Sequence, residues 1–377
     1  MDFTFTEEQQ AAAETAQAVF ADVAPDAVPS PALTPGAVAD DLDRALWARL
    51  AATDLLGLVV DPAHGGSGLD PIALCLVLRA SARALARVPL LETGAVALTL
   101  QRYGPAATAA DLLPRVARGE LVLTAAAHGR TGHDPAPLAV TARRDTAGWT
   151  LDGHTSAVPW AHRADRIAVP AHTPDGRTVV ALVPGGHTGL TLAAQYGTHG
   201  ELLADLRLTD VRLGPDDVID TDGAWSWLHG LLATGTCALA LGLGEQVLAM
   251  TSDYTGRREQ FGHPVATFQA VAVQAADRYI DLRAMEVTLW QAAWRLASGA
   301  TTALPAAADI AVAKIWAAEG VRRVVQTAQH LHGGFGADTD YVLHRYHAWA
   351  KYLELSLGPA ARHEEELGDL LAAHPFA

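Results

Sequence analysis

The stretch that decides the fold is AWSWLHGLLATGTCALALGLGEQVLAMTSDYTGRREQFG, residues 224–262. Its apolar residues recur at helical spacing over most of its length, so it predicts one very long helix. Similar helical patterns cover residues 264–299, 304–334 and 340–374. Helices of this length normally pack side by side in an up-and-down bundle. We therefore expect residues 221–377 to form a C-terminal α-helical bundle of four helices.

The region before this bundle has a different periodicity. Residues 121–220 contain runs of alternating apolar and polar residues, such as LAVTARRDTAGWTLDG and RIAVPAHTPDGRTVVALVPGG. Turn residues interrupt these runs at Asp145–Gly148 and Pro174–Gly176. A period of two with Gly, Pro and Asp at the turns is typical of antiparallel strands. This segment is therefore predicted to be a middle β domain with an antiparallel sheet.

The first 120 residues return to helical patterns. Thr6, with Gln9 three positions later, has the signature of a capping box at the start of the first helix. The sequence thus predicts an α+β multidomain protein in three sequential parts. These parts are an N-terminal α-helical domain over residues 1–120, the β domain over 121–220 and the bundle over 221–377.

The overall composition narrows the range of partners. A net charge of −15 argues against binding to nucleic acid or to an anionic membrane surface. No uninterrupted apolar run approaches about 20 residues, and the N-terminus lacks a basic-then-apolar signal pattern. We therefore expect a cytoplasmic protein that does not enter a membrane. Cys75 and Cys237 fall in apolar helical segments, which predicts buried free thiols.

The segment QHLHGGFG, residues 329–336, contains two histidines followed by two glycines. In a strand, His330 and His332 would lie on one face and could share a metal ion, whereas a helix end would separate them. No cluster of Cys, Asp or Glu accompanies them, so we predict no metal site. Glycine costs about 1 kcal/mol relative to alanine inside a helix, so the segment predicts a turn at a helix end.

These segments together resemble the acyl-CoA dehydrogenase family along essentially the whole chain. GRREQFGHPVATFQAV, residues 256–271, is similar to the family's Arg-x-x-Phe-Gly segment. QHLHGGFG followed by YVLHRY, residues 341–346, is similar to its Gly-Gly segment, and residues 46–85 resemble its N-terminal helices and glycine turn. The QHLHGG and LHRY endings most resemble those of the actinobacterial steroid-degrading branch.

The resemblance implies FAD as cofactor and oxidation of the α,β bond of an acyl-CoA thioester, with an electron-transfer flavoprotein as a possible acceptor. In the family, two subunits hold each flavin. One supplies the isoalloxazine pocket and the catalytic base, and its neighbour supplies groups for the pyrophosphate and adenosine. The neighbour-facing positions implied by the resemblance are Arg258 for the pyrophosphate, together with Gln260, Phe261, Gln269, His330, Gly333 and Gly334. The competing interpretation of Arg258 is a surface ion pair with Asp253 or Glu259.

The isoalloxazine positions look changed in this chain. Thr124 is a candidate remnant of the family's Thr-Glu-Pro loop, but no Glu-Pro follows it. The family's Trp-x-Thr positions hold Ala157 and Pro159, and proline has no N–H to donate. Trp160 lies three positions after Ala157, so a shifted alignment could still supply an aromatic ring.

The two positions where the family places its base also look changed. Counting from the motifs puts Leu357 at one position and Leu232 at the other. His229, within one turn of Leu232, has a side chain suited to proton transfer, although a packed helix histidine is the simpler interpretation. Glu354, one turn before Leu357, is the other weak candidate, although an exposed acid next to Lys351 is the simpler interpretation.

Three hypotheses follow from this pattern. The first is a base-lacking subunit of an α2β2 heterotetramer, in which a paralogous subunit binds most of the acyl-CoA substrate, which could be steroid-derived. The second is a homo-oligomeric flavoprotein of the same family with a non-standard base in biosynthetic chemistry. The third is a non-catalytic scaffold that has kept only the fold.

Overall fold

The computed structural model describes residues 4–25, 39, 41–131 and 135–374. Within them the chain changes from helix to strand after α5 (Ala106–Ala117) and back to helix after β8 (Val218–Ile219). Contacts divide the chain into two compact units. The helical unit comprises Met1–Ala37, Cys75–Ala86 and Ala233–Ala377, and the sheet unit comprises Val38–Leu74 and Arg87–Leu232. The division into three sequential domains stays a prediction.

The sheet unit contains an eight-stranded sheet in the order β6-β7-β3-β2-β4-β5-β8, with β1 paired to β4. Its remaining helices are α2 (Arg44–Ala52) and α4 (Leu90–Tyr103), and the turns predicted at residues 145–148 and 174–176 join β2 to β3 and β4 to β5. The strands are β1 (Leu123–Ala125), β2 (Val140–Arg144), β3 (Trp149–Pro159), β4 (Arg166–His172), β5 (Thr178–Pro184), β6 (Leu190–Tyr196), β7 (Leu202–Leu213) and β8.

The sheet is mixed and not wholly antiparallel as the alternation suggested. β1 runs parallel to β4 over Leu123–Ala125, and β2 meets β4 in parallel at Thr141 and His172. The other pairings are antiparallel. Alternation of apolar residues reports which side chains share a face, but it carries no information on the direction of the neighbouring strand. The direction of β1 therefore could not be read from its own residues.

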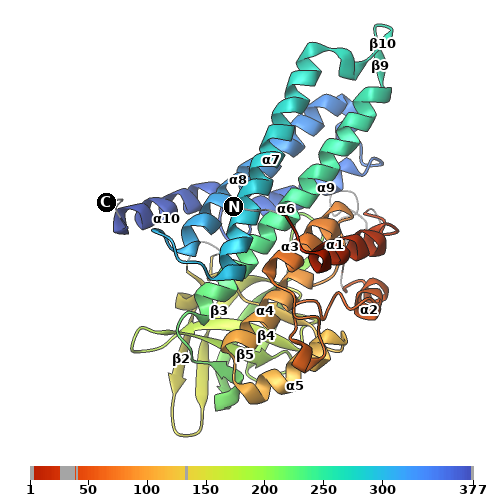
Figure 1. The fold of residues 1–377 in the computed structure, drawn as a ribbon. Coiled ribbons are helices and arrows are strands. Elements are labelled where there is room, and N and C mark those ends of the chain that lie inside the picture. The colour runs from red at the N-terminus through yellow and green to blue at the C-terminus, as the bar shows by residue number, and fades with distance from the viewer. Residues whose placement is uncertain (1–3, 26–38, 40, 132–134, 375–377) are drawn as a thin grey trace. The chain divides into compact units, whose positions relative to one another are not determined.

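The helical unit is built around the long helices α6 (Ala224–Arg257), α7 (Gln269–Ser298) and α8 (Ala306–His332), which run side by side (Figure 1). The first helix, α1 (Glu7–Phe20), begins with the predicted capping box, in which Thr6 and Gln9 exchange hydrogen bonds. α3 (Pro71–Arg83) approaches α6 closely, because a β-carbon at Gly242 would lie only 2.0 Å from the Arg79 carbonyl oxygen. Glycine at this position is therefore required by packing.

The last helical pattern is broken into two helices, α9 (Leu343–Leu355) and α10 (Ala360–Ala373). Leu357 has a φ of 59° and Gly358 a φ of 107°, so the chain turns sharply between them. A non-glycine residue in the left-handed region is uncommon and costs free energy. The break therefore falls on one of the two positions where the family's base was sought.

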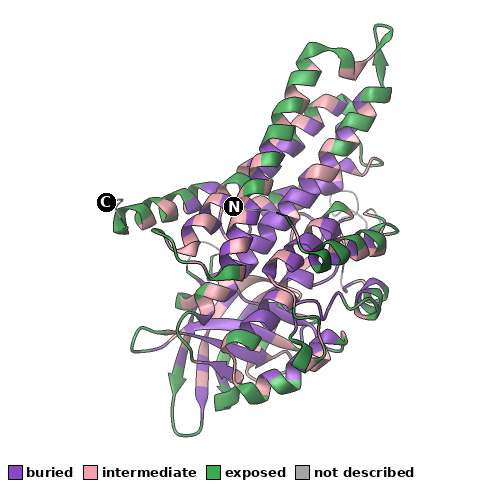
Figure 2. Ribbon diagram, viewed as in Figure 1, coloured by how far each residue is buried: buried purple, intermediate pink, exposed green. Residues whose placement is uncertain are grey.

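The apolar character of α6 reflects burial in the protein. By length and mean hydropathy this helix would be long enough to cross a membrane, although it contains no uninterrupted apolar run of that length. However, 78% of its most apolar window is buried inside the structure, as the core helix of a bundle requires. Figure 2 shows the buried residues along α6 and the exposed ones along the outer part of α7. Cys75 and Cys237 are both buried free thiols, as predicted.

Candidate cofactor site

The Gly-Gly segment ends helix α8 as predicted. The helix stops at His332, and a short 3-10 turn (Gly333–Ala337) follows. Gly333 has a φ of 61° and a ψ of −139°, a conformation that is essentially restricted to glycine. A β-carbon at Gly333 or Gly334 would meet no atom within 4 Å, so both glycines face open space. The backbone here is accessible to a ligand.

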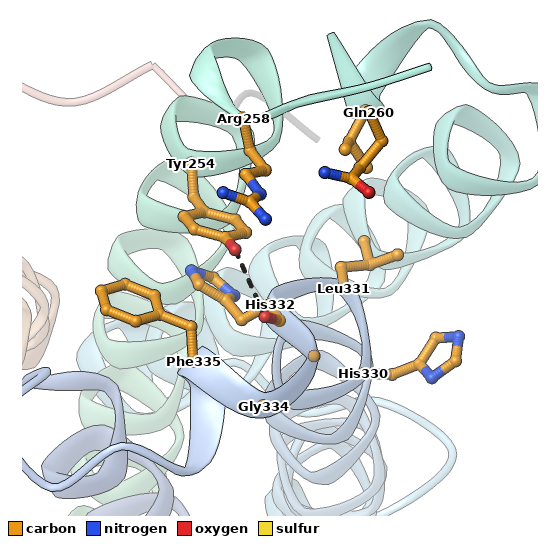
Figure 3. A pocket seen from close by; sticks show the side chains of 10 residues that line it. Tyr254, Arg258, Gln260, His330, Leu331, His332, Gly334 and Phe335 are labelled. Carbon is orange, nitrogen blue, oxygen red and sulfur yellow. Dashed lines mark hydrogen bonds between the residues drawn. The ribbon is translucent and has the colours of Figure 1, made fainter.

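A cleft of about 620 Å³ lies over these glycines, within the helical unit (Figure 3). It is formed where the end of α8 meets the end of α6 and the hairpin that follows α6. Its lining residues are Tyr254, Arg258, Gln260, Val265, His330, Leu331, His332, Gly333, Gly334 and Phe335. The cleft therefore brings together five of the seven cofactor-binding residues that the sequence predicted, although their role stays a prediction.

A stack of aromatic rings forms one wall of the cleft. The Tyr254 ring stacks on His332 with ring centres 4.3 Å apart and on Phe335 with ring centres 5.5 Å apart. Tyr341 completes the cluster, 4.4 Å from Phe335 and 5.3 Å from His332. Such a stack gives the end of α8 a fixed, flat apolar surface beside the glycines.

His332 is held rigidly in this stack. Its Nδ1–H donates to the Ala328 carbonyl at 2.8 Å, and its Nε2 accepts from the Tyr341 hydroxyl at 3.2 Å. Burial lowers the pKa of His332 below its ordinary value, which favours the neutral ring that these two bonds require. His330, in contrast, is exposed and projects away from the stack (Figure 3). The two histidines thus have different environments, as expected at a helix end.

Arg258 is the charged group of the cleft. It follows the last residue of α6, and its N–H donates to the Tyr254 carbonyl at 2.8 Å. The alternative prediction, an ion pair of Arg258 with Asp253 or Glu259, is wrong. Asp253 pairs with the neighbouring Arg257 at 2.6 Å, and within the described residues no ion pair joins Arg258 to Glu259. Among the residues that the structure describes, the Arg258 guanidinium has no ion-pair partner and points into the cleft (Figure 3). A free guanidinium facing open glycine backbone fits an anionic phosphate group.

Two predicted residues lie outside the cleft lining. Phe261 lies at the tip of the hairpin formed by β9 (Glu259–Gln260) and β10 (His263–Pro264), where the residue is 91% exposed. Gln269 is the exposed first residue of α7. Neither contacts the cleft within this chain, so any contact with a cofactor would require that cofactor to extend beyond the cleft.

The cleft also has lining residues that were not predicted from the sequence, namely Tyr254, Val265, Leu331, His332 and Phe335. Tyr254 lies four residues before Arg258 and therefore on the same side of the helix end, a signal that helical spacing offers. The partners of its ring come from a segment more than 70 residues later. Spacing along one helix could not identify that contact.

The first family base position, Leu232, lies on α6 and is 4% exposed. His229, one turn earlier, packs its ring against that of Trp225 with ring centres 5.4 Å apart. This contact agrees with the simpler interpretation of a packed histidine. Whether His229 has a chemical role stays a prediction.

The second base position is Leu357, in the turn after α9. Glu354, one turn earlier, pairs with Lys351 at 2.6 Å as expected, but its side chain is only 13% exposed, so the description of an exposed acid is wrong. The fully buried Lys314 amine donates to the carbonyl of Leu353, the residue before Glu354, at 3.2 Å. Burial lowers the pKa of Lys314 to about 8. This interior amine therefore caps the end of α9.

The segments predicted to correspond to the family's isoalloxazine pocket lie in the sheet unit and form hydrogen bonds with each other. The buried Thr124 hydroxyl donates to the Pro159 carbonyl at 2.6 Å. Ser156 bonds through its N–H and its hydroxyl to the Gly129 carbonyl, at 3.2 and 3.1 Å. Ala157 and Trp160 have φ values of 54° and 58°, so the chain is irregular here. Residues 132–134 of the predicted loop lie outside the described residues.

Comparison with known proteins places this architecture in one family. Residues 6–120 match the acyl-CoA dehydrogenase N-terminal domain, and residues 232–370 match the acyl-CoA dehydrogenase C-terminal domain. The chain is 35% identical over 338 residues to acyl-CoA dehydrogenase FadE27 of Mycobacterium tuberculosis, covering 88% of this chain and 89% of that protein. It is also 29% identical over 370 residues to FadE28 of the same organism, covering 98% of each chain.

Solved structures agree with this match. A chain of the ChsE4-ChsE5 complex from Mycobacterium tuberculosis superposes with a TM-score of 0.90 and 33% identity over the full length of both chains. A chain of the Tcur3481-Tcur3483 steroid acyl-CoA dehydrogenase, solved as a single-residue variant, gives a TM-score of 0.88 and 36% identity, covering 97% of this chain and 98% of that one. The chain therefore belongs to the acyl-CoA dehydrogenase family, whose members are oxidoreductases acting on CH–CH bonds.

Proposed function

We propose that this chain is the subunit of an FAD-dependent acyl-CoA dehydrogenase that completes the flavin site of a paralogous catalytic subunit. In this role it supplies no catalytic base of its own. One observation carries the proposal: the cleft around Arg258 and the two glycines is retained, whereas leucine occupies both base positions, at residues 232 and 357. This chain therefore keeps the half of the site that would contact the flavin phosphates and lacks the half that would supply the base.

The cleft fits the phosphate side of the cofactor. Arg258 offers two or more parallel N–H donors to phosphate oxygens, and charge-assisted hydrogen bonds of this kind contribute about 1.5–3 kcal/mol. Gly333 and Gly334 leave room for the cofactor to approach the backbone, and Gln260 and His330 can donate from either side. When bound, the flavin supplies the hydride acceptor of the reaction.

Proton removal is the function that this chain lacks. A general base has to be a titratable group within reach of the proton that it removes. A leucine side chain has no such group, and Glu354 is already paired with Lys351 and lies mostly buried. The chain alone is therefore expected to be almost inactive, because removing a general base typically lowers the rate by about 10² to 10⁴.

The sheet unit supports the same division of labour. The Thr124 hydroxyl, which would otherwise be available to a flavin ring, is bonded to the Pro159 carbonyl. Alanine and proline replace the residues that would face the ring at positions 157 and 159. We infer that the isoalloxazine ring is held by the partner subunit.

The two similar solved structures are both named as pairs of proteins, and one is named a steroid acyl-CoA dehydrogenase. These names favour a paralogous partner in an α2β2 assembly and a bulky, steroid-derived acyl-CoA as substrate. The partner would contain the base and most of the substrate pocket.

The test is to purify this chain alone and together with the paralogue that co-purifies with it, and to measure flavin per chain and acyl-CoA oxidation. We expect about one FAD for every two chains in the complex, and little flavin and almost no activity in the chain alone. A homo-oligomer of this chain with one flavin per chain and full activity would overturn the proposal. That result would favour a flavoprotein with a non-standard base.

A further inference from the structure

The glycine turn at the cleft has an unusual backbone that its open side does not support. Gly333 has a φ of 61° and a ψ of −139°, and a β-carbon at Gly333 or Gly334 would meet no atom within 4 Å. A conformation of this kind persists only when the surrounding structure holds it in place. The support therefore has to come from the residues on either side of the turn.

The support before the turn is His332, which is only 3% exposed. The Tyr254 hydroxyl donates to the His332 carbonyl at 3.4 Å (Figure 3), and the N–H of Gly333 donates to the His330 carbonyl. The peptide that enters the turn is thus bonded at both ends. A β-carbon at Gly336 would lie only 2.9 Å from the His332 β-carbon, so the chain after the turn packs directly onto this side chain.

The support after the turn is Tyr341, whose hydroxyl donates to His332 Nε2 at 3.2 Å. The direction of this bond follows from the other ring nitrogen. Nδ1 lies 2.8 Å from the Ala328 carbonyl, which can only accept, so Nδ1 carries the proton and Nε2 of the neutral ring accepts. Burial lowers the pKa of His332, which favours this neutral ring. The bond therefore links the chain on the two sides of the turn.

Tyr341 does not itself belong to the described residues that line the cleft. Its ring lies against Phe335 with ring centres 4.4 Å apart, and its carbonyl accepts from His344 Nδ1 at 2.8 Å. These two contacts fix Tyr341 just before α9 and do not involve its hydroxyl. Any effect of the hydroxyl on a ligand in the cleft would therefore pass through His332.

We propose that Tyr341 is a positioning residue for the cofactor, which holds His332 through its hydroxyl and thereby keeps the Gly333–Gly334 backbone in the conformation that the cofactor phosphates approach. The inference rests on the proposed function for the identity of the ligand, but not for the geometry of the turn. Without the hydroxyl the turn can take other conformations, so binding has to order it first and becomes weaker.

Tyr341→Phe removes the hydroxyl and keeps the ring. Titration of the apo-complex with FAD should show an affinity about fivefold below the native value, as expected for the loss of one uncharged hydrogen bond. Tyr346→Phe is the matched control, because the Tyr346 hydroxyl donates to the Arg83 carbonyl at 2.6 Å, and neither residue lines the cleft. This control should leave the FAD affinity unchanged, and an equal loss in both variants would reject the proposal.

A double-mutant cycle separates positioning from a general loss of stability. In a His332→Asn chain the amide can replace Nδ1 but does not reach the Tyr341 hydroxyl. If the hydroxyl acts through His332, Tyr341→Phe should lower the FAD affinity by less than about twofold in this background. Equal losses in the native and His332→Asn backgrounds would overturn the proposal.

Hydrogen exchange followed by mass spectrometry tests the turn without flavin. In the apo-complex, Tyr341→Phe should speed amide exchange in residues 333–340 severalfold, because the turn then opens more often. The Tyr346→Phe control should not change exchange in this segment. Unchanged exchange in Tyr341→Phe would contradict the positioning role, even if the FAD affinity fell.

Arg258→Ala, titrated in parallel, distinguishes a failure of this inference from a failure of the proposed function. If Arg258→Ala weakens FAD binding and Tyr341→Phe does not, the positioning role is rejected and the proposed function is kept. If neither variant weakens FAD binding, the proposed function is rejected, and flavin is not the ligand of the turn.

Discussion

Polar groups are left without internal partners in the cleft of the helical unit, whereas those of the β1–β3 region in the sheet unit bond to each other. In the cleft, Arg258 has no ion-pair partner among the described residues, and two glycines leave backbone uncovered. Near β1, the Thr124 hydroxyl and the Pro159 carbonyl satisfy each other. Buried polar groups that pair internally need no ligand, whereas a guanidinium facing an open cleft has capacity left for one. This difference supports the proposal that the cleft is the side of the chain that faces a ligand.

The most direct test of this difference is a substitution at Arg258. Arg258→Ala should weaken flavin retention by the complex roughly ten- to hundredfold, because a charge-assisted hydrogen bond of about 1.5–3 kcal/mol is lost. The measurement is a titration of the apo-complex with FAD, followed by fluorescence. Arg257→Ala is the matched control, because Arg257 is the adjacent arginine and pairs with Asp253. Equal losses in the two variants would contradict the assignment of Arg258.

Lys314 tests the other half of the comparison, because it is a buried polar group of the helical unit that bonds within the chain. Burial lowers its pKa to about 8, from 10.5 for an unperturbed lysine. Between these values the unfolded chain keeps the proton that the folded chain has released, so stability rises with pH. Relative to Lys314→Met, the unfolding free energy of the native chain should rise by roughly 2 kcal/mol between pH 7 and pH 9.5.

Urea unfolding of both chains at the two pH values measures this difference. Lys351→Met is the control, because the Lys351 side chain is 47% exposed, and its difference from the native chain should change little with pH. A pH-independent difference for Lys314→Met would show that the amine is not held in a buried site.

Thr124→Val sharpens the comparison in the sheet unit. Valine has nearly the shape of threonine but cannot donate to the Pro159 carbonyl, so the unfolding free energy should fall by about 1 kcal/mol. Flavin content of the complex should not change, since this hydroxyl is engaged within the chain. Thr191→Val, at an exposed position on β6, should change neither quantity. A loss of flavin in Thr124→Val would place this region in the cofactor site.

The smallest expected effect is at the second base position. Leu357→Glu should give the isolated chain no acyl-CoA oxidation above background, measured with an artificial electron acceptor. A carboxylate in this left-handed turn would still lack the flavin ring that the altered β1–β3 region is not expected to hold. Measurable activity in this variant would show that only the base was missing. It would contradict the inference that the β1–β3 region cannot hold a flavin ring.

The fold was largely predictable because its signals are local. The capping box at Thr6, the turns of the sheet and the end of α8 at the glycines each depend on a few neighbouring residues. The parallel pairing of β1 with β4 was not predictable, because periodicity defines faces and not partners. The break at Leu357 was hidden in a helical pattern, since leucine gives no local signal for a positive φ.

The candidate site was predictable in part for the same reason. Arg258 and the two glycines were identified from motif resemblance, and the structure gathers them in one cleft. The ring stack of Tyr254, His332 and Phe335 joins segments far apart in sequence and needed the tertiary structure. The tertiary structure was also needed to decide whether Arg257 or Arg258 pairs with Asp253, because two adjacent arginines are the same residue type and differ only in where their side chains point.

The hairpin tip has a consequence for how the subunit must be produced. Phe261 is 91% exposed and meets Phe268 edge-to-face at 6.3 Å, so an aromatic pair stands in water at the end of the helical unit. Exposed aromatic surface promotes non-specific association of a chain that has not met its partner. If the proposed pairing holds, production of this chain in excess of its paralogue should therefore yield aggregates, and balanced co-production should keep it dispersed. The stoichiometry of synthesis, and not only the affinity of assembly, would then limit how much working enzyme a cell contains.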